Sequence, residues 1–182
     1  NRVLIFEKKD GHFYQTQVFD QIGVRPHYTV YDEATNRFYV LSSMTGELYV
    51  FYRQPTDNRI ALEKILSVPD LNGYYVRSFT IDGSDVYFVS GNRAILRARL
   101  SDLQIQESWP IPDSIAGMIQ LTRIQDYFYI TVSTDLYGDQ NYATILRTTD
   151  LSNLAEGNWE DIYPRFIGGG TPYYLSAFDG HY

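Results

Sequence analysis

The chain has 182 residues, of which 44% are hydrophobic and 16% aromatic, and this composition is typical of a folded globular protein. Its 15 basic and 22 acidic residues give a formal net charge of −7 without any basic run, which argues against binding of nucleic acid through the phosphate backbone. Cysteine is absent, so disulfides, thiolate metal sites and a cysteine nucleophile are excluded.

The two ends of the sequence both fall within strand-like runs, which begin at Asn1 and stop at Tyr182. We therefore expect a processed or trimmed piece of a longer protein. The N-terminus lacks the basic-then-apolar pattern of a signal peptide, and no stretch approaches the ~20 apolar residues that span a bilayer. Few lysines, many Tyr, Asn and Asp residues and an expected loss of a leader favour a bacterial protein that is secreted, periplasmic or on the cell surface.

Short apolar runs rich in Tyr, Val, Ile and Phe follow one another along the chain and are separated by turn signals such as KKDGH, IDGSD and FDGH. They predict β-strands throughout. Residues 101–117 are the one place where a short helix could be argued, but Pro110 and Pro112 favour a strand and a loop there. We expect one domain, or a fragment of one, with two strands in 1–20 and further groups of strands at 24–70, 74–112, 117–165 and 171–182.

An eight-residue strand pattern recurs four times and ends at Asp32, Asp82, Gln125 and Asp179, which are 50, 43 and 54 residues apart. Each of these anchor residues is followed by a second apolar strand, and each of the first three also by a hairpin. Four strands at this period predict the four-stranded antiparallel blade of a β-propeller. A ring of four blades, in which 171–182 completes the blade that 1–20 begins, and a larger ring cut short both fit the pattern.

Two stretches resemble known propeller repeats. TIDGSDVYFVSGNRAILRARL, residues 80–100, resembles the repeat of propellers of the NHL and YVTN kind. RTTDLSNLAEGNWED, residues 147–161, is similar to the Asp-box hairpin of sialidase-like propellers and to hairpins of five-bladed glycoside hydrolases. The second resemblance implies a structural turn in which Asp150 accepts backbone N–H groups and Trp159 packs beneath it, although these two residues are farther apart than the Asp box allows.

Polar residues stand near the start of each recurring strand. Counting back five from each anchor residue gives His27, Arg77, Gln120 and Tyr174, which period-2 alternation places on one face. In a propeller the first strand of each blade lines the central channel, so the resemblance implies a ring of ligand-binding side chains at the channel mouth. Its rim would carry Arg25, Tyr28, Tyr75 and Tyr173. A channel that is merely filled with water explains the same polar residues and stays open as the alternative.

Metal and cofactor chemistry finds little support in the sequence. Only His12, His27 and His181 are histidines, so a multi-histidine metal site is hard to assemble. The sequence has no P-loop and no dinucleotide-binding fingerprint. We therefore expect no metal and no cofactor.

Enzyme chemistry would need a facing pair of carboxylates for glycoside hydrolysis. Asp32, Asp82 and Asp179 stand instead beside turn residues, where carboxylates cap backbone N–H groups. We therefore expect no catalytic residue and interpret the chain as a non-catalytic module that binds a protein or a carbohydrate at the channel mouth. A glycoside hydrolase or sialidase-like enzyme is the alternative, and the sequence leaves the oligomeric state open.

Overall fold

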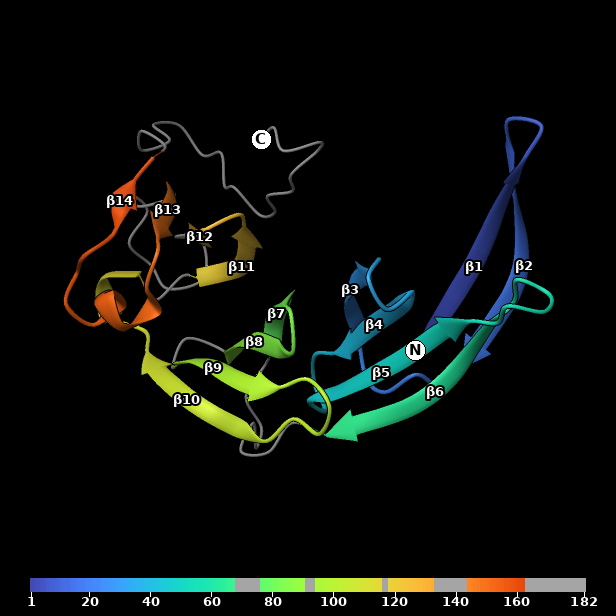
Figure 1. Cartoon of the computed structure of the whole chain (residues 1–182), viewed down its shortest axis with the longest axis horizontal. Helices are drawn as coiled ribbons and strands as arrows, with labels where there is room; N and C mark the ends of the chain where they lie inside the picture. The colour runs from blue at the N-terminus through green and yellow to red at the C-terminus, as the bar shows by residue number, and fades with distance from the viewer. Residues whose placement is uncertain (68–75, 91–93, 116–117, 133–143, 163–182) are drawn as a thin grey trace. The chain divides into compact units, whose positions relative to one another are not determined.

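The computed structural model describes residues 1–67, 76–90, 94–115, 118–132 and 144–162, and these residues form an all-β chain (Figure 1). The chain divides into two compact units, residues 1–75 and 76–182. In the described residues, no helix has the length and apolar character needed to cross a membrane.

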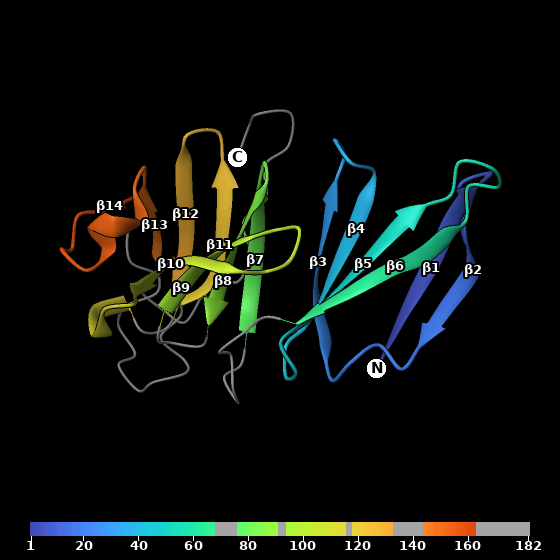
Figure 2. The ribbon, with the colours of Figure 1, turned by 60° about the horizontal axis from the view of Figure 1, so that its bottom comes forward.

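The first unit combines a hairpin with a four-stranded antiparallel sheet in the order β3-β4-β5-β6 (Figure 2). The hairpin strands are β1 (Arg2–Lys9) and β2 (His12–Asp20), and the sheet strands are β3 (Pro26–Asp32), β4 (Arg37–Ser42), β5 (Glu47–Arg53) and β6 (Ile60–Ser67). Asp10 and Gly11 join β1 to β2 with φ angles of 52° and 80°. Two left-handed residues make the type of tight turn that suits the twist of a hairpin.

The second unit contains two further four-stranded antiparallel sheets, in the orders β7-β8-β9-β10 and β11-β12-β13-β14. Their strands are β7 (Val76–Asp82), β8 (Asp85–Ser90), β9 (Ala94–Arg99), β10 (Ile105–Pro110), β11 (Met118–Ile124), β12 (Tyr127–Val132), β13 (Thr144–Thr148) and β14 (Glu160–Asp161). The described part of this unit also contains two short 3₁₀ turns, Asp113–Ile115 and Leu151–Leu154. The first turn follows Pro112, and the strand expected within 101–117 is β10.

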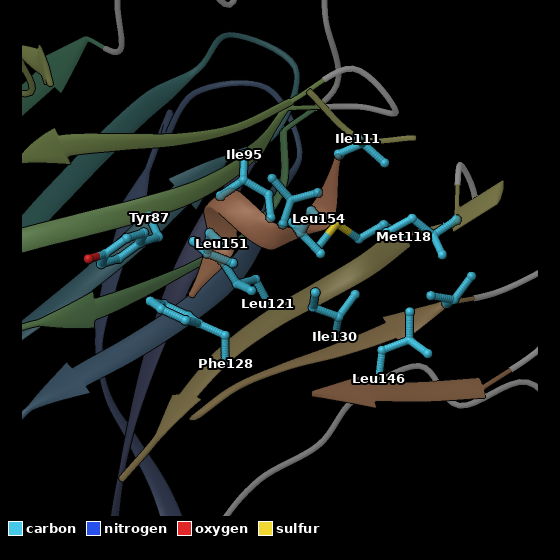
Figure 3. Packing of buried hydrophobic residues seen from close by; sticks show 13 residues of the cluster. Tyr87, Ile95, Ile111, Met118, Leu121, Phe128, Ile130, Leu146, Leu151 and Leu154 are labelled. Atoms are coloured by element: carbon cyan, nitrogen blue, oxygen red, sulfur yellow. The ribbon is translucent and has the colours of Figure 1, made fainter. Parts of the chain in front are cut away.

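A hydrophobic cluster joins the two sheets of the second unit (Figure 3). Tyr87 of β8 meets the ring of Phe128 of β12 edge-on, with 5.0 Å between the centroids. Trp109 and Trp159 are half-buried against the cluster. Its buried members are Tyr87, Val89, Ile95, Ile111, Ile115, Met118, Leu121, Phe128, Ile130, Val132, Leu146, Leu151 and Leu154. Because the two sheets share this core, they form one packed unit.

The hairpin of the first unit packs on one face of its sheet. Val3, Ile5 and Phe19 lie against a cluster that includes Val40 and Phe51. The side-chain amide of Gln17 also bonds to both backbone groups of Ile60: Nε2 donates to the carbonyl at 2.8 Å and Oε1 accepts from the N–H at 2.8 Å. This amide completes hydrogen bonds that a neighbouring strand would otherwise make.

Three consecutive four-stranded antiparallel sheets, in each of which the strands follow one another in chain order, are blades of the β-propeller type. In the second unit the first strands, β7 and β11, lie directly against each other through hydrogen bonds at two positions. The predicted fold class, an all-β propeller fold built from four-stranded blades, is therefore confirmed.

Candidate functional site

Each of the first strands β3, β7 and β11 has an irregular beginning. The pairing with the second strand slips by one residue between Pro26 and Tyr28, between Val76 and Ser78, and between Met118 and Gln120. The extra residue in each case is the second of the strand: His27, Arg77 and Ile119. The same β-bulge therefore stands at the second residue of each of these strands, and the three positions are equivalent in the repeat.

Gln120 is consequently one residue away from the position that we predicted for it. It lies opposite Thr131, as Tyr28 lies opposite Leu41 and Ser78 opposite Val89. The error arises at the anchor, because Gln125 has a φ of 53° and belongs to the turn, whereas Asp32 and Asp82 end their strands. A slip of one residue moves a side chain to the other face of a sheet. Gln120 is only 3% exposed and donates from Nε2 to the hydroxyl of Thr122 at 2.7 Å.

The other predicted ligand-binding residues fall in both units. Arg25 and His27 are exposed and Tyr28 is half-buried in the first unit, and Arg77 is half-buried in the second. Tyr75, Tyr173 and Tyr174 lie outside the described residues, as does the anchor Asp179. Within each unit the structure brings together Arg25, His27 and Tyr28 at the start of β3, and places Arg77 and Gln120 at the starts of two adjacent strands.

Arg25 has a left-handed backbone, with a φ of 58°, immediately before Pro26. Its carbonyl accepts the N–H of Ser43 at 3.1 Å, and its own N–H donates to Oδ1 of Asn1 at 3.3 Å. A left-handed conformation costs a residue with a side chain about 1–2 kcal/mol. The surrounding hydrogen bonds hold Arg25 in this unfavourable conformation.

A polar network beneath this loop fixes the chain that precedes β3. Ser42, which is fully buried, accepts the N–H of Val24 at 2.9 Å, and its hydroxyl lies 3.0 Å from the Val24 carbonyl and 2.6 Å from Oγ1 of Thr45. Thr45 and Tyr49 both donate to Oε2 of Glu47, at 2.8 and 3.0 Å. Burial, followed by the hydrogen bond from Tyr49 to Glu47, raises the pKa of the Tyr49 phenol. The network holds the loop in one conformation.

In the second unit, polar side chains of β7 join the two sheets. The hydroxyls of Ser78 and Thr80 accept the backbone N–H groups of Leu121 and Arg123 at 3.1 and 3.2 Å. Nε of Arg123 also lies 3.4 Å from Oδ2 of Asp82. The Cζ atom of the same guanidinium group lies over the ring of Phe128, 4.5 Å from its centroid. Part of the polar character of these strands therefore serves the packing of one blade on the next.

The anchor carboxylates have different partners in the two units. Asp32 caps its turn, because Oδ1 accepts the N–H of Ala34 at 3.1 Å and Oδ2 accepts the hydroxyl of Thr35. Asp82, which we expected to cap a turn as well, pairs with Arg123 of the neighbouring sheet. Among the described residues, no group of three or more His, Asp or Glu side chains is arranged to hold a metal ion.

Asp150 and Trp159 belong to the loop between β13 and β14. Asp150 accepts the N–H of Ser152 at 2.9 Å and caps the 3₁₀ turn Leu151–Leu154, and this bond lowers the pKa of its carboxyl group. Thr148 supports the turn by donating to the Asp150 carbonyl at 2.9 Å. Trp159 is half-buried against the hydrophobic cluster. Both residues therefore help to hold the hairpin in place.

With this geometry established, known proteins provide a comparison. No family model and no curated protein matches the chain. Among solved structures, a protein from Lactobacillus plantarum has a TM-score of 0.56 at 12% identity, covering 94% of this chain and 50% of that one. A luciferin-regenerating enzyme reaches 0.53 at 15% identity, covering 78% and 49%. A functionally unknown protein from Desulfotomaculum acetoxidans DSM 771 also reaches 0.53, at 14% identity, covering 93% and 49%.

These likenesses show a shared fold. The chain spans about half the length of the structures that it matches. Identities of this size do not extend an activity from one protein to another.

Sequence reasoning missed the network formed by Ser42, Thr45, Glu47 and Tyr49. The stretch SSMTGE predicts only a turn, whereas the network depends on Gly23 and Val24, which are about 20 residues away in the chain. The available signal is the cluster of short hydroxyl side chains beside Glu47, because such groups are suited to bonding a neighbouring loop.

Proposed function

We propose that this chain is a non-catalytic propeller module that binds a protein or a carbohydrate at the start of β3. The observation that carries the proposal is the loop before β3, where Arg25 has a left-handed backbone beside an exposed, bulged His27. Strained residues that are held in place by their surroundings cluster at ligand-binding sites. Bulges are enriched at such sites as well.

The left-handed backbone of Arg25 supports a binding site over a channel that is merely filled with water. An exposed side chain that only meets water has no need of a left-handed backbone, and glycine would occupy this position at lower cost. The presence of an arginine here in place of glycine, on a loop that the network supports, therefore favours a role for the side chain itself.

The chemistry of the residues at the start of β3 suits polar ligands. A guanidinium group offers five N–H donors in a planar fork, which match the oxygens of carboxylates and of neighbouring hydroxyls. Tyr28 adds a half-buried aromatic ring, and tyrosine contributes contact area at a low entropic cost. Protein and carbohydrate surfaces both present such groups.

Two libraries test the proposal: an array of mono- and oligosaccharides, and an array of synthetic peptides. We expect wild-type protein to bind members of one array, and Arg25→Gly and His27→Ala to lose that binding by at least about tenfold. Arg25→Gly should also stabilise the fold by about 1 kcal/mol, because it relieves the left-handed strain while removing the side chain. His12→Ala, at an exposed position in β2, serves as the matched control.

The outcomes separate the hypotheses. Loss of binding in stable Arg25→Gly protein supports the site, whereas unchanged binding in both variants refutes it. If the variants unfold, the side chains have a structural role. Cleavage of an arrayed oligosaccharide would show that the chain is an enzyme and not a non-catalytic binding module.

A further inference from the structure

Two exposed apolar residues stand beside Arg25, where β3 begins. Val24 is 44% exposed, and Met44, in the turn between β4 and β5, is 49% exposed. The N–H of Met44 donates to the Val24 carbonyl at 3.3 Å, next to the bond from Ser43 to Arg25, so Val24 and Met44 are neighbours in space. Exposed apolar residues that lie together, in contrast to single ones, mark interaction sites.

The backbone that carries the Val24–Met44 pair is held from beneath. Oγ of Ser42 accepts the Val24 N–H at 2.9 Å, and the same hydroxyl lies 2.6 Å from Oγ1 of Thr45, the residue after Met44. Gly46 closes the turn by donating its N–H to the Ser42 carbonyl at 3.0 Å. A loop that is already fixed loses little conformational freedom when a ligand binds, so more of the contact energy remains as affinity.

Arg25 places a permanent cation next to this apolar pair. The acidic residues of the region lie elsewhere. Glu47 is beneath the loop, where its Oε2 accepts two side-chain hydroxyls, and Asp20 lies opposite Arg2 in the hairpin. The planar fork of a guanidinium group matches a carboxylate, so a ligand that packs on the pair is favoured if it carries a carboxylate beside its apolar group.

The chemistry of the pair favours a protein over a carbohydrate. A sugar ring packs best on a flat aromatic face, whereas the exposed apolar groups here are aliphatic, and Tyr28 nearby is half-buried. Methionine and arginine are both enriched in protein–protein interfaces. The flexible thioether of methionine also adapts its shape to a neighbouring side chain.

We infer, on the basis of the function proposed above, that the ligand at the start of β3 is a segment of a partner protein in which an apolar side chain stands next to a carboxylate. The apolar side chain packs on Val24 and Met44, and the carboxylate accepts hydrogen bonds from the guanidinium group of Arg25. Apolar burial supplies the affinity, and the arginine selects the acidic neighbour.

The two methionines of the sequence, Met44 and Met118, provide a probe of this contact. With ¹³C in the methyl groups, the protein gives one NMR signal from the exposed Met44 and one from Met118, which is fully buried in the second unit. A hexapeptide of glycine and serine that carries leucine followed by aspartate should shift the Met44 signal and leave that of Met118 in place. Leucine–lysine and serine–aspartate peptides should need at least about tenfold higher concentrations for the same shift.

Matched serine substitutions locate the contact. Val24→Ser should weaken binding of the leucine–aspartate peptide about tenfold, because it removes half of the apolar pair. Ile65→Ser on β6, at a position that is 48% exposed, should leave this binding within about twofold. Arg25→Gly should reduce the preference for aspartate over lysine to less than about twofold.

The inference is overturned if the leucine–aspartate peptide leaves the Met44 signal in place. If an oligosaccharide shifts that signal instead, the ligand is a carbohydrate and the proposed binding site stands. Peptide binding that Val24→Ser leaves unchanged, or that keeps its preference for aspartate in Arg25→Gly protein, overturns the inference as well. If no arrayed peptide or sugar depends on Arg25 or His27 for binding, the proposed function fails together with it.

Discussion

At the scale of single residues, Gly23 shows how closely the loop before β3 fits its support. It has a φ of 46°, and a Cβ atom built on it would lie 2.3 Å from Oγ and 2.5 Å from Cβ of Ser42. Both the backbone conformation and the available space therefore require glycine at this position.

We predict that Gly23→Ala lowers the free energy of unfolding by about 2–4 kcal/mol, which combines left-handed strain with overpacking against a buried serine. Urea denaturation followed by circular dichroism measures the loss. Gly11→Ala is the matched control, because Gly11 also has a positive φ, of 80°, but a Cβ atom added to it would meet no other atom within 4 Å. We expect it to cost only the strain, about 1–2 kcal/mol. Equal losses of unfolding free energy in the two variants would mean that the loop moves away from Ser42 and makes room for the added Cβ atom.

The residue scale also marks the limit of the sequence prediction. Counting back five residues from each anchor aligned His27 with Arg77 correctly, because both strands end at an aspartate and contain the same bulge. The same count failed at Gln120, since nothing in the sequence shows that Gln125 belongs to a turn. Nor could alternation reveal Ser42 as the support of a distant loop, because that contact depends on tertiary packing.

At the scale of elements, the attachment of the β1–β2 hairpin depends on Gln17 as well as on apolar packing. Its amide is half-buried and bonds to both the N–H and the C=O of Ile60. A carboxylate at this position could accept the N–H but would repel the carbonyl. We predict that Gln17→Glu destabilises the hairpin by about 1–3 kcal/mol. Faster hydrogen exchange in β1 and β2 measures the effect.

Gln15→Glu provides the control for this prediction. Gln15 lies on the same strand and is exposed, so the variant adds the same charge without touching the Ile60 link. We expect its stability to stay within about 0.5 kcal/mol of that of the wild type. If the amides of β1 and β2 exchange hydrogen at equal rates in both variants, the link to Ile60 contributes nothing to holding the hairpin.

The strands themselves were the most predictable elements. The runs RFYVLS, VYFVS and YFYITV were expected as second strands and form β4, most of β8 and all of β12. Turn signals between apolar runs are local, and local chemistry is enough to place them. The 3₁₀ turn Leu151–Leu154 was not expected, because its two buried leucines owe their position to the core that they enter.

At the scale of the whole molecule, the repeat in the sequence was sufficient to predict the fold class. Each period supplies one sheet that cannot bury both of its faces alone, and packing of one sheet on another provides the core. The division into two compact units was not predicted, because no change of composition marks residue 75. Solved structures at 12–15% identity share the fold, so the architecture tolerates extensive change of sequence.

Buried tyrosines in both units make the free energy of unfolding depend on pH in the alkaline range. Burial raises the pKa values of Tyr39 and Tyr49 in the first unit and of Tyr87 in the second above the usual 10.0. Below about pH 9 each phenol is protonated in the folded and unfolded states alike, so stability there does not depend on these groups. Above it the unfolded chain releases its protons first, which favours unfolding.

We predict that the free energy of unfolding is level to about pH 9 and then falls, by up to about 1.4 kcal/mol per pH unit for each of the three tyrosines. Urea denaturation at a series of pH values measures the slope. Tyr49→Phe should reduce the slope above pH 10 while costing about 1 kcal/mol at neutral pH, because it removes the bond to Glu47. An unaltered slope in Tyr49→Phe would show that this phenol ionises as readily in the folded protein as in the unfolded chain.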